Sequence, residues 1–238
     1  MRLALETATD RASVALGTSS ADAVTREIGG IRRHAAELLP MIDAVLREAG
    51  VRLDAIRGIV LSDGPGSFTG LRVGAAVAKA LVQARGLPLW IAPSLMVRAA
   101  GAARPGATVV AVSDALRGEL YVAAYRFDAA GVRTLLSPAV RRPEELVSEA
   151  LSPDLLVGEL PEPARQLLER WAGQAVIGPP AGWPDARMLL DLVGQPGGAV
   201  RVEPVEGWQP VYGRPAEAQA RWETAHGRPL PDSIGSRG

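Results

Sequence analysis

Asp63-Gly-Pro-Gly-Ser-Phe-Thr-Gly-Leu-Arg-Val-Gly, residues 63–74, is the most informative motif of the chain. It follows a compact apolar run, residues 56–61, and precedes a segment rich in small residues, 71–84. This order predicts a strand, a glycine turn and a helix. Glycines ahead of a helix can bring backbone N–H groups close to an anion or to another chain.

The spacing of these glycines fits no standard phosphate-binding loop. A Walker A loop requires Gly-Lys-Ser/Thr after four intervening residues, and a dinucleotide fingerprint requires a third glycine where Thr69 stands. A structural turn and a binding loop are therefore both open. The small residues of the following helix, Gly70, Gly74 and Ala76 among them, allow another helix to approach closely, which favours a packing or docking surface.

The segments on either side of the glycine stretch predict a hairpin followed by alternating helices and strands. Expected strands cover residues 3–5, 13–16, 23–28 and 88–91, with a polar turn at 6–11. Apolar residues at helical spacing predict a helix from His34 to the stop at Gly50, and another helix is expected at 94–103. A breaker, Arg104-Pro-Gly, ends this part of the chain.

Beyond that breaker the pattern starts again, which indicates a diverged duplication. Residues 109–125 read once more as strand, acidic polar turn and strand. Helices are then expected at 144–151, 164–171 and 185–192, with strands at 155–157 and 175–177. The alternation predicts an α/β layered fold with subdomains at 1–104 and 105–215. A polar, small-residue tail, 216–238, is expected to be disordered.

Composition narrows the possible functions. The chain has 238 residues and 47% apolar content, enough for a buried core, and its 26 basic and 26 acidic residues balance. No strong attraction to nucleic acid or to an anionic membrane is therefore built in. The sequence has no cysteine, which excludes disulfides and thiolate nucleophiles. No signal-peptide core or long apolar run is visible, so we expect a cytoplasmic protein without a membrane contact.

Candidate catalytic residues are few. Histidine occurs only at His34 and His226, which give no metal-ligand spacing, although His34 and Glu37 share a helix face. Glu6 and Asp114 stand in the two hairpin turns, where they could form a carboxylate pair for acid–base chemistry or could cap the turns. No Gly-x-Ser-x-Gly elbow accompanies the serines, so a serine hydrolase is not indicated.

The motifs described above, taken together, resemble the TsaB (YeaZ) family. The resemblance is carried, in order and spacing, by five stretches: Leu3-Ala-Leu-Glu-Thr-Ala-Thr, Ser13-Val-Ala-Leu, His34-Ala-Ala-Glu-Leu-Leu-Pro, Gly64-Pro-Gly-Ser-Phe-Thr-Gly-Leu-Arg-Val-Gly with Ala78-Lys-Ala-Leu, and Asp114-Ala-Leu-Arg-Gly-Glu-Leu-Tyr. Pro210-Val-Tyr-Gly-Arg-Pro also resembles a short segment near the end of that family, so the resemblance spans about residues 1 to 215.

The resemblance implies a duplicated, actin-like ASKHA fold with ribonuclease H-like halves. It further implies a non-catalytic subunit of the complex that transfers a threonylcarbamoyl group to adenosine in tRNA. The implied partners are a TsaD-type catalytic paralogue and a TsaE-type ATPase, with tRNA reached indirectly and a homodimer possible for the isolated chain. ATP and metal are expected on the partners and no cofactor on this chain.

Two substitutions bear on that expectation. The paralogue binds metal through a His-x-x-x-His pair on the helix that here begins at His34, and its second position is Leu38 in this chain. One of the two histidine ligands is therefore missing. A metallopeptidase needs such ligands, so this substitution argues against the peptidase activity once assigned to the superfamily. Glu6 stands where the family usually carries Asp, which puts a preserved nucleotide site in doubt.

The family docks through the two helices beside the glycine stretch, here about residues 34–49 and 70–84. The partner interface predicted on that basis consists of His34, Leu38, Leu39, Ile42, Gly64, Gly66, Gly70, Leu71, Arg72, Val73, Ala76 and Lys79. The competing hypothesis is an independent ATP-dependent kinase-like or hydrolytic enzyme of the same fold. A pure tRNA binder is disfavoured by the zero net charge and by the lack of a basic–aromatic motif.

Overall fold

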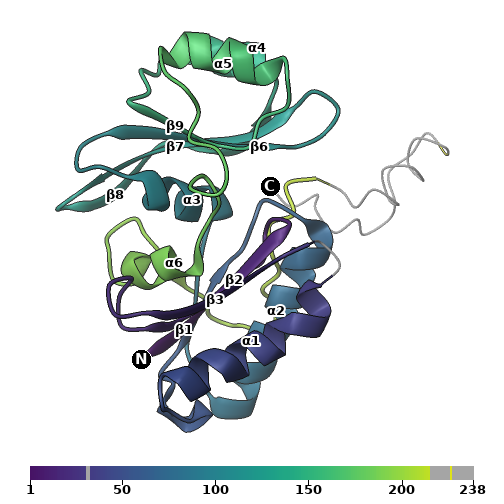
Figure 1. Ribbon diagram of the computed structural model, residues 1–238, viewed down its shortest axis with the longest axis vertical. Coiled ribbons are helices and arrows are strands. Elements are labelled where there is room, and N and C mark those ends of the chain that lie inside the picture. Colours follow the sequence, from purple (N-terminus) through teal and green to yellow (C-terminus); the bar gives the residue numbers. More distant parts are fainter. Residues whose placement is uncertain (31–32, 215–225, 227–238) are drawn as a thin grey trace.

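A computed structural model describes residues 1–30, 33–214 and 226 of the chain. Two β-sheets lie one above the other, with helices on both outer faces and a helical layer between them (Figure 1). The predicted tail, 216–238, lies outside the described residues apart from His226. Within the described part, no helix has both the length and the apolar character needed to cross a membrane.

The first sheet has the strand order β10-β5-β4-β1-β2-β3. β1 and β2 form an antiparallel hairpin, β3 continues it, and β4 and β5 add in parallel on the other side of β1. The elements of this half are β1 (Arg2–Glu6), β2 (Arg11–Gly17), β3 (Val24–Gly29), α1 (His34–Glu48), η1 (Leu53–Ala55), β4 (Ile59–Ser62), α2 (Phe68–Arg85), β5 (Leu89–Ala92) and α3 (Ser94–Ala102).

The second sheet repeats this topology in the order β8-β7-β6-β9. β6 and β7 form the hairpin, β8 continues it, and β9 pairs in parallel with β6. The elements are β6 (Thr108–Asp114), β7 (Leu120–Asp128), β8 (Gly131–Arg141), α4 (Pro143–Ser148), β9 (Leu155–Gly158), α5 (Ala164–Ala172), α6 (Ala186–Leu192) and β10 (Val200–Arg201). The predicted duplication and the α/β fold class are confirmed.

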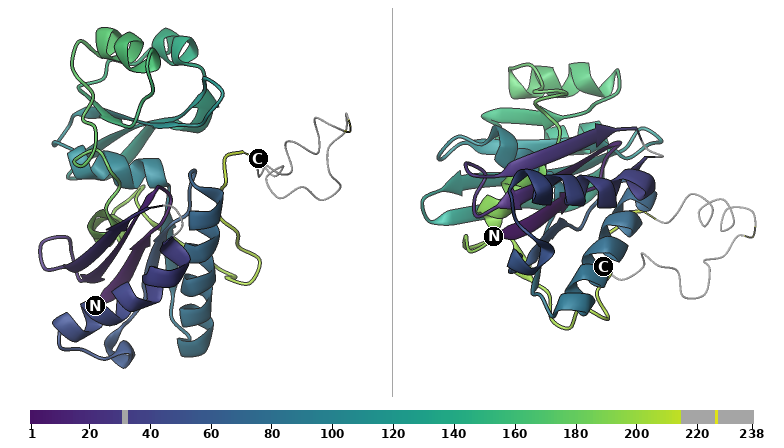
Figure 2. Two further views of the ribbon diagram at one scale, coloured as in Figure 1. Left: turned by 45° about the vertical axis from the view of Figure 1, so that its right-hand side comes forward. Right: turned by 60° about the horizontal axis from the view of Figure 1, so that its bottom comes forward.

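Three apolar cores hold these layers together. One joins α1 and α2 to the outer face of the first sheet, and another joins α4 and α5 to the second sheet. The third lies between the sheets, where α6 packs on β1, β2 and β4, α3 packs on β6, β7 and β9, and the two helices touch (Figure 2). Because this middle core is continuous, the two halves are joined by buried apolar surface.

The chain returns to the first sheet after completing the second. Residues past 185 belong in sequence to the predicted subdomain 105–215, yet α6 covers the first sheet and β10 pairs antiparallel with β5. Residues 202–214, which we call the strap, then run beside α2 (Figure 2). The strap brings the end of the described chain back to the glycine stretch.

Several predicted elements differ from the structure in their limits. α2 begins at Phe68, three residues before the predicted start, because the Ser67 hydroxyl accepts the Gly70 N–H and caps the helix. The apolar run at 56–61 becomes a strand only from Ile59. The predicted strand at 175–177 was wrong: the described contact is one bridge between Val157 and Ile177. β8 and β10 were not predicted.

Candidate functional site

The glycines of residues 63–74 let α2 lie directly on the first hairpin turn. A Cβ at Gly66 or Gly70 would overlap the carbonyl oxygens of Ala8 and Thr7, and a Cβ at Gly74 would overlap the Thr7 side chain. The Ser67 N–H also donates to the Ala8 carbonyl over 2.7 Å. These contacts are made within the chain, so they support the structural-turn interpretation of the motif.

Gly64 has a different role, since it admits the strap. Its φ of +108° suits glycine, and a Cβ there would overlap the Val211 carbonyl. The Val211 N–H donates to the Asp63 carbonyl over 2.7 Å, and the Tyr212 ring lies 4.6 Å from that of Phe68. Farther along α2, Lys79 Nζ donates to the Glu206 carbonyl. The strap therefore contacts α2 at two places, near Phe68 at the start of the helix and at Lys79 farther along it.

The predicted interface residues divide into a buried and an outward group. His34, Leu38 and Ile42 are buried against the sheet, whereas 57% of Leu39 is exposed. On and before α2, Gly64, Gly70 and Leu71 are buried and Gly66 is partly buried, while Lys79 contacts the strap. Arg72 and Ala76 are exposed, and Val73 is half-buried at the edge of the core that α1 and α2 share. We call Leu39, Arg72, Val73 and Ala76 the outer helical face.

This face has the chemistry of a helix docking surface. α1 and α2 pack side by side and bury their inner sides in the same core, whereas Leu39, Arg72 and Ala76 remain exposed. Ala76 and its exposed neighbour one turn on, Ala80, are small and allow a facing helix to come close. Val73 and Leu39 add apolar area beside them.

A second candidate region is the seam between the halves, where β1 and β6 end at equivalent positions. Glu6 ends β1 and is fully buried, whereas Asp114 ends β6 and is exposed. Burial raises the pKa of Glu6 to about 7, although the nearby Ser62 hydroxyl and the Ala8 N–H, which donates to Glu6 over 2.6 Å, act in the opposite direction. Asp114 accepts the Leu116 N–H and caps its own turn. The two carboxyl groups thus have different environments.

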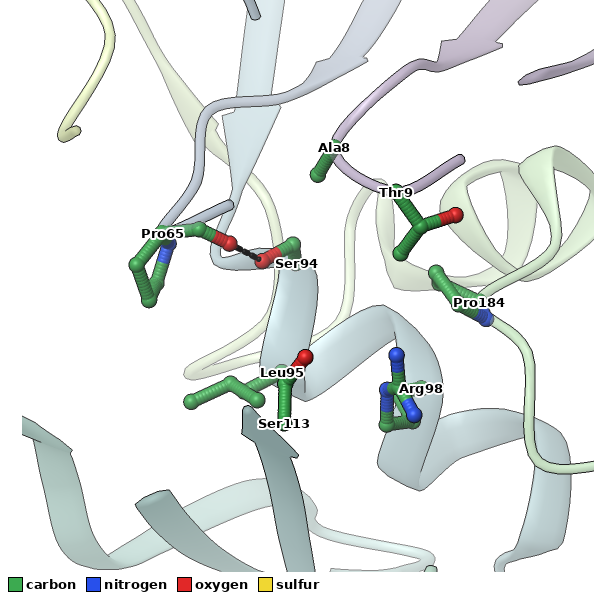
Figure 3. A pocket seen from close by; sticks show the side chains of 8 residues that line it. All are labelled: Ala8, Thr9, Pro65, Ser94, Leu95, Arg98, Ser113 and Pro184. Carbon is green, nitrogen blue, oxygen red and sulfur yellow. Dashed lines mark hydrogen bonds between the residues drawn. The ribbon is translucent and has the colours of Figure 1, made fainter. Parts of the chain in front are cut away.

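Arg98 completes the seam, and the sequence did not single it out. It is the only charged residue of α3, is 2% exposed, and lies 3.9 Å from Glu159 across the seam. With Ala8, Thr9, Pro65, Ser94, Leu95, Ser113 and Pro184 it lines a cavity of about 10 Å³ (Figure 3). Such a cavity has room for about one water molecule. A lone arginine in an apolar helix was the signal that could have found it.

The Ser94 hydroxyl fixes one wall of this cavity by donating to the Pro65 carbonyl (Figure 3). Asp63, just before that loop, is nearly buried, and burial raises its pKa to about 7 as well. Among the described residues there is no group of three or more His, Cys, Asp and Glu side chains placed to hold a metal ion.

Two copies of one strand–hairpin–helix unit, packed across a shared helical layer, define the duplicated actin-like (ASKHA) class. The family model described as "TsaD: tRNA N6-adenosine threonylcarbamoyltransferase" matches residues 14–167. The crystal structure of YeaZ from Pseudomonas aeruginosa superposes with a TM-score of 0.71 at 32% identity, covering 89% of this chain and 100% of that one. The chain belongs to the TsaB (YeaZ) family within this class.

Two named relatives are called "tRNA threonylcarbamoyladenosine biosynthesis protein TsaB". The Escherichia coli protein is 39% identical over 132 residues, which are 55% of this chain and 57% of that protein. The Haemophilus influenzae protein is 38% identical over 121 residues, which are 50% of this chain and 51% of that protein. The chain therefore spans little more than half the length of these two relatives.

Proposed function

We propose that this chain takes part in tRNA threonylcarbamoyladenosine biosynthesis as a non-catalytic subunit that docks a TsaD-type partner. The names of its relatives support the pathway. The observation that carries the docking role is the outer helical face, which presents Leu39, Val73 and Ala76 on two adjacent helices. An apolar, small-residue surface on paired helices favours the approach of another helix.

The chemistry is assigned to the partners. At the seam, where an actin-like protein could open toward a ligand, Leu95, Arg98, Pro65 and Pro184 line a cavity of only about 10 Å³. His34, at the start of α1, is buried against the sheet, and Leu38 is buried one turn later. In this proposal ATP and metal are bound by the TsaD-type paralogue and a TsaE-type ATPase, tRNA is reached through the complex, and the assembly works in the cytoplasm.

Reconstitution tests the proposal. Threonylcarbamoyl transfer to tRNA is measured with the TsaD-type partner, the ATPase and an adenylate synthase, with this chain present, omitted or supplied alone. We expect transfer only when this chain and the partner are both present. Unchanged transfer on omission would refute the accessory role, and tight ATP binding or ATP hydrolysis by the isolated chain would favour the independent enzyme.

The docking face is tested with substitutions on α2. Val73→Glu and Ala76→Glu place a carboxylate on the outer helical face and are expected to abolish measurable partner binding in calorimetry. Ala129→Glu, on an exposed turn of the second half, is the matched control and should bind normally. Normal binding by both α2 variants would exclude this face.

A further inference from the structure

The turn between β6 and β7, residues 115–118, is strained and exposed at the same time. Leu116 and Arg117 have φ values of +64° and +56°, a left-handed conformation that is unfavourable for side chains other than glycine. The Leu116 side chain is nevertheless 65% exposed, and Arg117 is exposed beside it. The turn therefore stores backbone strain to present an apolar side chain and a charged one to solvent.

The equivalent turn of the first half shows what a covered turn looks like. There Thr7 and Ala8 are buried beneath the N-terminal end of α2, through the glycine contacts described above. In the second half the equivalent helix, α5, packs against β9 and α4 instead. Leu116 and Arg117 are left at the surface.

A chain of contacts connects this bare turn to α2. Arg214, at the end of the strap, forms an ion pair with Glu119, and the Tyr121 hydroxyl donates to the Tyr212 carbonyl over 3.3 Å. The Tyr212 ring packs on Phe68, and the Arg72 guanidinium lies 5.3 Å from the centre of the Phe68 ring. The turn, the strap end and the start of α2 therefore form one continuous surface.

This surface is apolar and positively charged. Val211 is 54% exposed on the strap, and Leu116 supplies a second apolar side chain. Glu119 is engaged by Arg214, and Asp114 is engaged by the Leu116 N–H, whereas neither Arg72 nor Arg117 takes part in an ion pair among the described residues. We call Arg72, Val211, Leu116 and Arg117 the turn patch. Arginine beside apolar side chains is typical of the centre of a protein interface.

We propose that the turn patch extends the docking face onto the second half and is covered by the same partner subunit. Arg72 belongs to both surfaces, so they are continuous. The positive charge calls for a partner surface that places acidic side chains around an apolar centre. This inference rests on the proposed docking function, because it assigns to that partner a second area of contact, beyond the helices.

The experiment measures the affinity of the intact chain for its TsaD-type partner. Arg117→Glu is expected to weaken binding about tenfold and to lower its salt dependence. Leu116→Ala should weaken it several-fold. The matched controls are Arg133→Glu, an exposed arginine on β8, and Val200→Ala, an apolar side chain on β10 that is 58% exposed. Both controls should bind as the unaltered chain does.

A stability measurement separates function from folding. Leu116→Gly relieves the backbone strain of the left-handed conformation, so it should raise Tm by a few degrees. The same variant should still bind the partner more weakly than the unaltered chain does. If Leu116→Ala and Arg117→Glu bind normally and Val73→Glu does not, the turn patch is excluded and the proposed function stands. If the partner fails to bind the unaltered chain, both proposals fail. Loss of tRNA binding without loss of partner binding in Arg117→Glu would replace the protein partner by RNA.

Discussion

The two halves share one topology but differ in the helices that cover their outer faces. In the first half α1 has 15 residues and α2 has 18, whereas α4 and α5 of the second half have 6 and 9. The short helices suffice to close an apolar core with Leu146 and Leu168. The long helices also build an outer surface that the fold does not need.

The hairpin turns differ in the same direction. The first turn is buried beneath a glycine-rich helix start, and Glu6 at its entrance is enclosed. The second turn is bare, and Asp114 at the equivalent position faces solvent. Duplication has therefore preserved positions in the chain while their environments have diverged, and most of the substitutions that follow compare one half with the other.

The largest effect is expected at Gly70, where α2 meets the first turn. Gly70→Ala places a methyl group on the Thr7 carbonyl and should cost about 3 kcal/mol of unfolding free energy. The control is Gly101→Ala in α3, where a Cβ would meet Met188 only at 3.9 Å. That control should be neutral or slightly stabilising. Urea unfolding of both variants measures the difference, and equal midpoints would disprove the close-packing role.

An effect of similar size is expected at Glu6 and depends on pH. The folded chain holds the Glu6 proton up to about pH 7, whereas the unfolded chain releases it near 4.5, so the free energy of unfolding falls as the pH rises through this window. Glu6→Gln should remove this loss, which amounts to about 3 kcal/mol of unfolding free energy between pH 4 and pH 8.

Asp114→Asn is the matched variant for Glu6→Gln, since Asp114 is exposed at the equivalent position. Its unfolding free energy should follow that of the unaltered chain at both pH values. Asp63 keeps its own raised pKa in both variants, so part of the pH dependence persists. An unchanged pH profile in Glu6→Gln would mean that Glu6 is ionised in the folded chain.

Partner binding should respond to a new charge on the outer helices of the first half and not to one on the outer helices of the second half. Leu39→Glu on α1 is expected to lower the affinity for the TsaD-type partner about tenfold, which corresponds to about 1.4 kcal/mol of binding free energy. Gln166→Glu puts the same side chain on the exposed surface of α5 and should leave the affinity unchanged. Equal losses in the two variants, measured by calorimetry, would contradict a docking face confined to the outer helices of the first half.

The smallest effect is expected at the helix cap. Ser67→Ala removes the hydroxyl that accepts the Gly70 N–H and should cost about 1 kcal/mol. Ser148→Ala, at the exposed end of α4, removes a bond to the Glu145 carbonyl and should cost less than about 0.5 kcal/mol. Thermal unfolding with both variants checks the order, which would be contradicted by a larger loss in Ser148→Ala.

The sequence predicted the order of most elements because apolar periodicity is a local property. It did not predict β8, whose alternation is interrupted by Pro138, or β10, which has two residues and exists through its pairing with β5. The strap was recognised as a motif at 210–215, but its position beside Gly64 depends on contacts between distant parts of the chain. Such contacts leave no periodic signal.

The candidate site was predicted in part for the same reason. Helical spacing located the stripe of α1, but it could not tell that Leu38 and Ile42 face inward whereas Leu39 faces outward, since that depends on the neighbouring sheet. Glu6 was noticed in a turn, yet its raised pKa follows from burial among residues distant in the sequence, with Ser62, Arg98 and Asp185 nearby. The position of Arg98 likewise depends on contacts between distant parts of the chain, such as the one with Glu159.

The return of α6 and β10 to the first sheet also determines when the first half can complete its folding during translation. The strands of the first sheet leave the exit tunnel early, but the helix that packs on β1, β2 and β4 from the inner side, α6, comes from residues 186–192. Until those residues emerge, the core that contains Ala4, Ala15 and Val60 lacks the side chains of α6. The half of the protein that is translated first is consequently the half that is finished last, and a nascent chain halted before α6 presents that uncovered sheet to chaperones.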